Sequence, residues 1–148
     1  MSAETHKFVV AQLHATCWRL RPQLVTTPSP VLAVIDGSLC RLSREGARAA
    51  SHAPLATAVV EFHHGAMCLY VRENPYGLLP GISNLYCLDG AFRLQWMADW
   101  PDASDPCAAI VRKEGDALIA TSMRGAMVRL DANTGRLLSV VWPMAAAS

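Results

Sequence analysis

The stretch NLYCLDGAFRLQWMADWP, residues 84–101, decides the fold because a second stretch further along the chain repeats its pattern. Residues 127–143, MVRLDANTGRLLSVVWP, again show a short apolar run, a turn that begins with Leu-Asp, a second apolar run and a closing Trp-Pro. Short apolar runs bounded by Gly, Pro, Asp and Asn are typical of strands and tight turns. Each stretch is therefore predicted to form two antiparallel strands joined by a turn.

The repeat extends upstream of both stretches. Residues 58–71, AVVEFHHGAMCLYV, align with residues 109–122, AIVRKEGDALIATS, so each repeat holds four short strands in a meander. A weaker third copy is GSLCRLSREG, residues 37–46, which is similar to the third strand of the other copies and its turn. Four strands in a period of about 40–45 residues are the signature of a propeller blade.

This pattern predicts an all-β fold of consecutive four-stranded antiparallel meanders, with two clear blade-like repeats and a degraded third. We expect one domain over residues 1–148. Its parts are the N-terminal strands with the degenerate repeat (1–56), a repeat (57–101), a second repeat (107–143) and a tail (144–148). The open edges of the sheets must then be covered by curling of the sheets, by the N-terminal segment or by a second chain.

The N-terminal part contains weaker signals. Residues 8–13 and 31–35 are predicted strands, and Asp36-Gly37 is a predicted hairpin turn because both of its positions favour a positive φ. The alanine-rich residues 47–56 are expected to hold a short helical turn or a loose connection.

The segment VRLDANTGRLLSVVW resembles the strand-turn-strand piece of pyrroloquinoline-quinone-type and WD40-like β-propeller blades. The matching residues are Val128, Leu130, Asp131, Thr134, Gly135, Leu137, Leu138 and Trp142. Residues 58–143 as a whole resemble small, mostly uncharacterised bacterial blade-repeat proteins. The resemblance implies blade-like sheets, and because propellers close with four or more blades, a closed monomeric propeller is not expected.

Composition excludes several classes of protein. Hydrophobic residues make up 52% and charged residues 17% of 148 residues, which excludes a disordered chain. A net charge of +1 gives no electrostatic footprint for nucleic acid or an anionic membrane. The five cysteines are widely spaced and form no C-x-x-C, so we expect reduced thiols and a soluble, cytoplasmic protein of bacterial type.

Metal-ligating residue types occur without a metal-binding pattern. His63, His64 and Cys68 lie close in sequence, as do His14 and Cys17, but adjacent histidines on a strand point to opposite faces. A zinc site needs three or four convergent ligands, and no such motif occurs. A further group of carboxylates, at residues 99, 102 and 105, lacks the spacing of a calcium loop and is expected to be a solvated loop. We therefore predict no metal.

No cofactor and no catalytic residue are predicted either. The quinone-type enzymes that carry similar blades hold their cofactor in a ring of eight blades, which two repeats do not build. A cysteine nucleophile needs a lowered pKa and a neighbouring base, and the sequence distinguishes none of the five cysteines in this way. We expect a protein that is not an enzyme. The alternative is a small enzyme that uses His63 or His64 with a cysteine.

The best candidate for a functional segment is the loop ENPYGLLPGIS, residues 73–83, which interrupts the first full repeat. Loops of this length inside a tight meander usually fold on themselves or bind something. Its apolar side chains either pack on the domain or contact a partner. We predict a partner-binding surface formed by Asn74, Tyr76, Leu78, Leu79, Ile82 and Trp100, while Trp96 is expected in the core.

These observations favour a non-enzymatic protein-binding module. A narrower hypothesis, based on fold analogy, is an immunity protein that neutralises a cognate bacterial toxin by occluding it. The alternative is a homo-oligomeric β-protein whose sheet edges pair across chains, with a small ligand bound in the resulting cleft. The expected partner is thus another protein or a second copy, and neither nucleic acid nor a membrane is expected.

Overall fold

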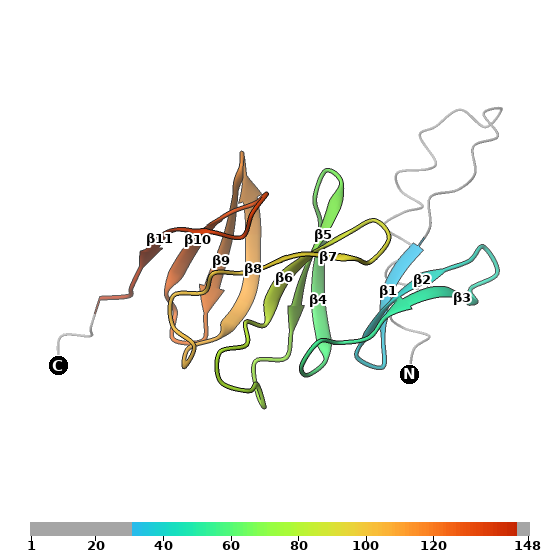
Figure 1. The fold of residues 1–148 in the computed structure, drawn as a ribbon, viewed down its shortest axis with the longest axis horizontal. Coiled ribbons are helices and arrows are strands. Elements are labelled where there is room, and N and C mark those ends of the chain that lie inside the picture. Colours follow the sequence, from blue (N-terminus) through green and yellow to red (C-terminus); the bar gives the residue numbers. More distant parts are fainter. Residues whose placement is uncertain (1–30, 145–148) are drawn as a thin grey trace. The chain divides into compact units, whose positions relative to one another are not determined.

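The structure, a computed structural model, describes residues 31–144, and these residues form strands and turns without a helix (Figure 1). In residues 31–144, three antiparallel sheets contain eleven strands. Sheet A holds β1 (Val31–Ile35), β2 (Ser38–Leu42) and β3 (Arg48–His52). Sheet B holds β4 (Val59–His64), β5 (Cys68–Glu73), β6 (Leu85–Asp89) and β7 (Leu94–Met97). Sheet C holds β8 (Cys107–Glu114), β9 (Ala117–Ser122), β10 (Met127–Asp131) and β11 (Leu137–Val141).

Each sheet is a simple meander in which strands adjacent in sequence are hydrogen-bonded neighbours. The two four-stranded sheets match the two clear repeats, and the three-stranded sheet matches the degraded copy. None of the three sheets closes on itself. The predicted fold class, blade-like antiparallel meanders, is therefore confirmed. Within the described residues there is no helix with the length and apolar character required to cross a membrane.

The chain divides into two compact units, one that ends at Pro54 and one that begins at Leu55. The expectation of a single domain stays a prediction. In the first unit the turn at Asp36 and Gly37 has φ angles of 52° and 78°, as the hairpin prediction requires. Residues 48–52 form a strand paired with β2, so the expected helical turn or loose connection in this region is wrong. The predicted strand at residues 8–13 lies outside the described residues.

Sheets B and C form the second unit and share one hydrophobic core. Tyr70, Cys87 and Trp96 of sheet B belong to the same buried cluster as Leu118 and Val128 of sheet C. Trp96 is therefore a core residue, as predicted. A β-bulge between Cys87 and Leu88 in the pairing of β6 with β7 leaves Leu94 48% exposed, although it lies two positions before the buried Trp96 on the same strand.

In the equivalent turns of the two repeats, an aspartate carboxylate accepts hydrogen bonds from backbone N–H groups of the turn. In sheet C the Asp131 carboxylate accepts hydrogen bonds from the backbone N–H groups of Asn133 and Thr134, and Gly135 has a φ of 76°. In sheet B the Asp89 carboxylate accepts from Ala91 and Arg93, but the positive φ, 64°, falls on Phe92. The turn predicted to begin with Leu88-Asp89 is therefore present, and its positive φ falls on a phenylalanine instead of a glycine.

The C-terminal turn also joins the two sheets. A Cβ atom on Gly135 would lie 2.7 Å from Cδ2 of Trp96, so the indole ring packs directly on this glycine. The backbone N–H of Asp99 donates to the Gly135 carbonyl at 2.8 Å, and the Asp99 carboxylate accepts from the Leu137 N–H at 3.3 Å. These contacts fix where the chain leaves sheet B and enters the connection to sheet C.

Candidate functional site

Three connections lie at one end of the second unit, and we call this end the loop end. They are residues 74–84 between β5 and β6, 98–106 between β7 and β8, and 123–126 between β9 and β10 (Figure 1). Alternate connections of an antiparallel meander share an end of the sheet. Two contacts tie the second of these connections to the third, since the N–H groups of Met123 and Arg124 donate to the Pro106 carbonyl and the Asp105 carboxylate.

Asn84 holds the base of the longest connection. Its side chain is 1% exposed, and its Nδ2 donates to the carbonyls of Glu73 and Cys107, each at 2.8 Å. Its Oδ1 accepts from the Cys107 N–H at 2.9 Å. One amide side chain therefore links the end of β5 to the start of β8. Such a buried and fully used polar group specifies a single arrangement of the chains around it.

Glu73, the first residue of the predicted loop, is the last residue of β5 and is 1% exposed. Its carboxylate accepts from the backbone N–H groups of Leu55, Ala56 and Thr57 and from the Tyr86 hydroxyl. Burial raises the pKa of this carboxyl, but the four hydrogen bonds outweigh it, so the pKa lies below its usual value. Glu73 is thus an ionised anchor for the strand that enters sheet B.

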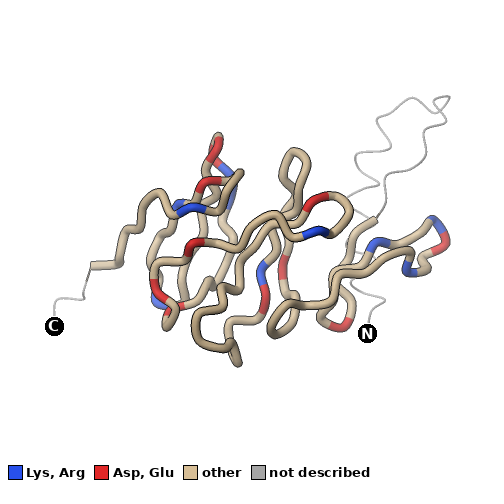
Figure 2. The backbone as a smooth tube through the Cα atoms, viewed as in Figure 1, with Lys and Arg blue, Asp and Glu red and all other residues tan. Residues whose placement is uncertain are grey.

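The loop beyond this anchor carries its apolar side chains in solvent. Tyr76 is 71% exposed and Leu79 70%, while Ile82 is 38% exposed and Leu78 is half-buried. Residues 74–83 contain no charged side chain, and Figure 2 shows the tube of this loop without red or blue. The sequence left open whether the apolar side chains of the loop pack on the domain or contact a partner. Tyr76 and Leu79 do not pack on the domain, because most of their surface is exposed.

The other residues predicted for the partner surface have different roles. Asn74 belongs to the loop's framework, because its N–H donates to the Ala58 carbonyl and its Oδ1 accepts from the Tyr76 N–H. Trp100 is half-buried, and its Nε1 donates to the Asp105 carbonyl at 2.7 Å. The structure thus separates an exposed pair, Tyr76 and Leu79, from residues that shape the surface. Binding by these residues stays a prediction.

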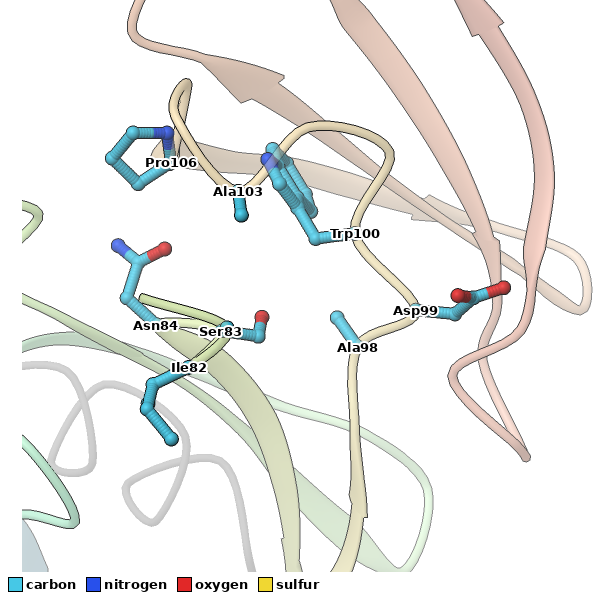
Figure 3. Close-up of a pocket in the computed structure, with 9 residues that line it drawn as sticks. Ile82, Ser83, Asn84, Ala98, Asp99, Trp100, Ala103 and Pro106 are labelled. Carbon is cyan, nitrogen blue, oxygen red and sulfur yellow. The ribbon is translucent and has the colours of Figure 1, made fainter. Parts of the chain in front are cut away.

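A hollow of about 270 Å³ lies where the two longer connections meet (Figure 3). Gly81, Ile82, Ser83 and Asn84 form one side, at the end of the first connection. Ala98, Asp99, Trp100, Ala103 and Pro106 of the second connection form the rest. The two stretches that the sequence pointed to, the apolar loop and the segment that begins at Trp100, therefore build one surface feature.

The carboxylates of the second connection do not form a cation site. Asp102 accepts from the N–H and hydroxyl groups of Ser104, and Asp99 accepts from Leu137. Asp105 is 1% exposed and accepts from the Arg124 N–H, while its Oδ2 has no hydrogen-bond partner among the described residues. Across residues 31–144 no three His, Cys, Asp or Glu side chains converge as metal ligands would.

The histidines of β4 lie apart from the loop end. His63 Nε2 is 3.3 Å from Glu61 Oε2, and the His64 ring packs edge-on against Phe62. Glu61 also accepts from Arg72 and from the Ile110 N–H, which ties β4 to β8. Burial raises the pKa of the Cys107 thiol to about 12. A high thiol pKa disfavours the thiolate that a nucleophile requires.

Sequence reasoning did not identify Glu73 and Asn84 as the anchors of the candidate site. Both residues look like ordinary polar loop residues at the borders of an apolar segment. Their partners lie between 11 and 23 residues away in sequence, so only the pairing of strands brings donors and acceptors together. The sequence did show that both residues lie next to predicted strands. At a strand end, a polar side chain can form hydrogen bonds with backbone groups that are not paired within the sheet.

Comparisons with known proteins bear on the fold. The chain matches no protein-family profile and no curated protein at the level of sequence. Its structure is similar to the crystal structure of BamB from Moraxella catarrhalis, a β-propeller protein, with a TM-score of 0.53 and 14% sequence identity. The similarity covers 80% of this chain and 34% of BamB, so the chain spans about a third of that protein's length. The fold is therefore propeller-like.

Proposed function

We propose that the chain is a non-enzymatic protein-binding module and that the loop end is its binding surface. The observation that carries this proposal is the exposure of Tyr76 and Leu79 on a loop without charge, next to a hollow. Exposed apolar side chains that gather on a firmly anchored loop are typical of interaction sites. Tyrosine is also among the residue types that contribute most to binding at protein interfaces.

Support for this proposal comes from the way the loop is built. Glu73 and Asn84 fix both ends of the loop through buried hydrogen bonds, so its backbone is held before any partner arrives. A pre-arranged surface loses less conformational entropy on binding than a disordered segment does. Such a surface suits recognition of a folded protein.

The test is capture of partner proteins from a lysate of the source cells by the tagged full chain, followed by quantitative mass spectrometry. The double variant Tyr76→Ser/Leu79→Ser should lose at least about tenfold of the captured partner, since two exposed anchors of a small interface are removed. Met67→Gln is the matched control, because Met67 is 88% exposed in the turn between β4 and β5 at the opposite end of sheet B. A partner retained by the double variant, or lost equally with Met67→Gln, would contradict the proposal.

The narrower proposal is that the partner is a toxin and that the chain neutralises it by occluding its surface. Co-expression of a captured partner with wild-type chain should then restore growth that the partner alone prevents, and the double variant should not restore it. Self-association that the same double variant abolishes would identify the partner as a second copy instead. A cytoplasmic location belongs to this proposal and is supported by the free thiols of Cys40, Cys68, Cys87 and Cys107.

A further inference from the structure

The hollow at the loop end has the size of a single side chain. Its volume of about 270 Å³ exceeds the roughly 150 Å³ that accommodates a benzene molecule in an apolar cavity. It falls below the range of roughly 300–1,000 Å³ typical of sites for drug-sized molecules. The space exists because small residues, among them Ser83, Ala98 and Ala103, face it (Figure 3).

The polar side chains around the hollow are already hydrogen-bonded within the chain. Ser83 Oγ donates to the Leu85 carbonyl at 3.2 Å. Asn84 uses its amide on Glu73 and Cys107, and Trp100 uses its Nε1 on Asp105. A polar occupant would therefore give up its bonds to water without gaining equivalent partners from these side chains, which is unfavourable.

The charges around the hollow also favour an apolar occupant. Asp99 is the one charged residue among the nine that line the hollow, and its carboxylate points away from the other lining side chains (Figure 3). That carboxylate also accepts a hydrogen bond from the Leu137 N–H. A cationic or anionic occupant would thus lose its hydration without a counter-charge inside the hollow. An uncharged occupant is the electrostatic complement of this site.

We infer that the hollow receives one uncharged aromatic side chain, such as phenylalanine, from the partner protein. The inference rests on the proposed function and specifies the chemistry of its anchor. Trp100 supplies an indole against which a ring can pack offset or edge-on, and Ile82 supplies an aliphatic wall.

N-acetyl-phenylalaninamide is a suitable probe, and it can be titrated into the isotopically labelled full chain and followed by NMR. We expect saturable shifts of the Trp100 Nε1–H and of the Ala98 and Ala103 methyl groups, with a dissociation constant on the order of 1 mM, as for a small fragment. N-acetyl-lysinamide should bind at least about tenfold more weakly, because its charge lacks a partner. N-acetyl-leucinamide tests the preference for a ring and should also bind more weakly.

The second part of the experiment uses a variant in which a side chain of the protein itself fills the hollow. Ala103 is exposed, so Ala103→Phe places a ring at the hollow without disturbing the core, and it should abolish the saturable shifts. Ala91→Phe, at an alanine that is also exposed and lies in the turn between β6 and β7, should leave them unchanged. Shifts that do not saturate, equal binding of the leucine or lysine probe, or unchanged binding to Ala103→Phe would overturn the inference.

The two proposals fail in different ways. If Tyr76→Ser/Leu79→Ser loses partner capture but the phenylalanine probe does not bind, the loop end is the interface and the aromatic anchor is wrong. If the probe binds as expected and the double variant captures the partner normally, the hollow has the inferred preference and the proposed interface is wrong.

Discussion

Replacing Gly135 by alanine should destabilise the second unit for two separable reasons. Gly135 has a φ of 76°, where a residue with a Cβ atom costs about 1–2 kcal/mol. The added Cβ would also lie 2.7 Å from Cδ2 of Trp96 and closer still to Cε3. Trp96 is 8% exposed in the core between the sheets, so its ring has little room to withdraw, and overpacking of this kind costs about 1–3 kcal/mol. The expected loss in the free energy of unfolding is about 2–5 kcal/mol.

Gly115→Ala is the matched control for the backbone term. Gly115 has a φ of 58°, and a Cβ atom there would meet no atom within 4 Å. It should therefore cost only about 1–2 kcal/mol. The difference between the two variants measures the contact with Trp96. Urea unfolding followed by far-ultraviolet circular dichroism supplies both values, provided that the dependence on urea concentration is the same for each variant.

A double-mutant cycle identifies the side chain responsible. In a Trp96→Leu background the steric part should vanish, so Gly135→Ala should cost about as much as Gly115→Ala. If Gly135→Ala costs no more than Gly115→Ala with Trp96 present, or if its cost is the same in both backgrounds, the packing of the indole on this glycine does not contribute to the stability of the second unit.

Three further predictions concern the two anchors, Glu73 and Asn84, and the turn between β6 and β7. Glu73→Gln should lower the free energy of unfolding by about 2–4 kcal/mol, because four donors lose a charged acceptor. The pKa of Glu73 is lower in the folded state than the usual 4.5, so the unfolded chain binds the proton first as the pH falls. The free energy of unfolding should therefore decrease as the pH drops below about 5. Denaturant titrations at several pH values should show a weaker acid dependence for Glu73→Gln. Asn84→Ala should cost about 2–4 kcal/mol, because the Cys107 N–H loses this acceptor and the carbonyls of Glu73 and Cys107 each lose a donor, and hydrogen exchange should increase at Cys107 more than at Val128. Phe92→Gly should raise the thermal midpoint by relieving a positive φ, with a net gain of up to about 1 kcal/mol, whereas an unchanged or lower midpoint would mean that the phenylalanine ring contributes more than its backbone costs.

The sequence predicted the sheets well because their signals are local. An Asp-Gly pair or an Asp-x-x-Thr-Gly turn between two apolar runs specifies a hairpin through its own backbone and side chains. The strand at Arg48–His52 was missed for the opposite reason. Its alanine and serine residues have little preference for a strand, and it becomes one by pairing with β2.

The same contrast explains what was predicted at the loop end. Length and apolar content marked residues 73–83 as unusual, and Tyr76 and Leu79 are indeed exposed. The hollow could not be predicted, because it depends on small side chains from two connections that are separated in sequence and come together only in the folded chain. Glu73 was placed in the loop, although it ends β5 and turns inward to bind the chain at residues 55–57.

The loop between β5 and β6 is much longer than its counterpart in the second repeat. The same position in the second repeat, between β9 and β10, is a turn of four residues, 123–126, and sheet C is complete with it. The core that joins the sheets includes residues on both sides of the longer loop, Tyr70 and Leu85, but none from 74–83. Those residues therefore add little to the burial that stabilises this core, yet they expose large apolar side chains at a cost in solvation. The proposed contact with another molecule would cover these side chains, and the variants at Tyr76 and Leu79 test that proposal directly.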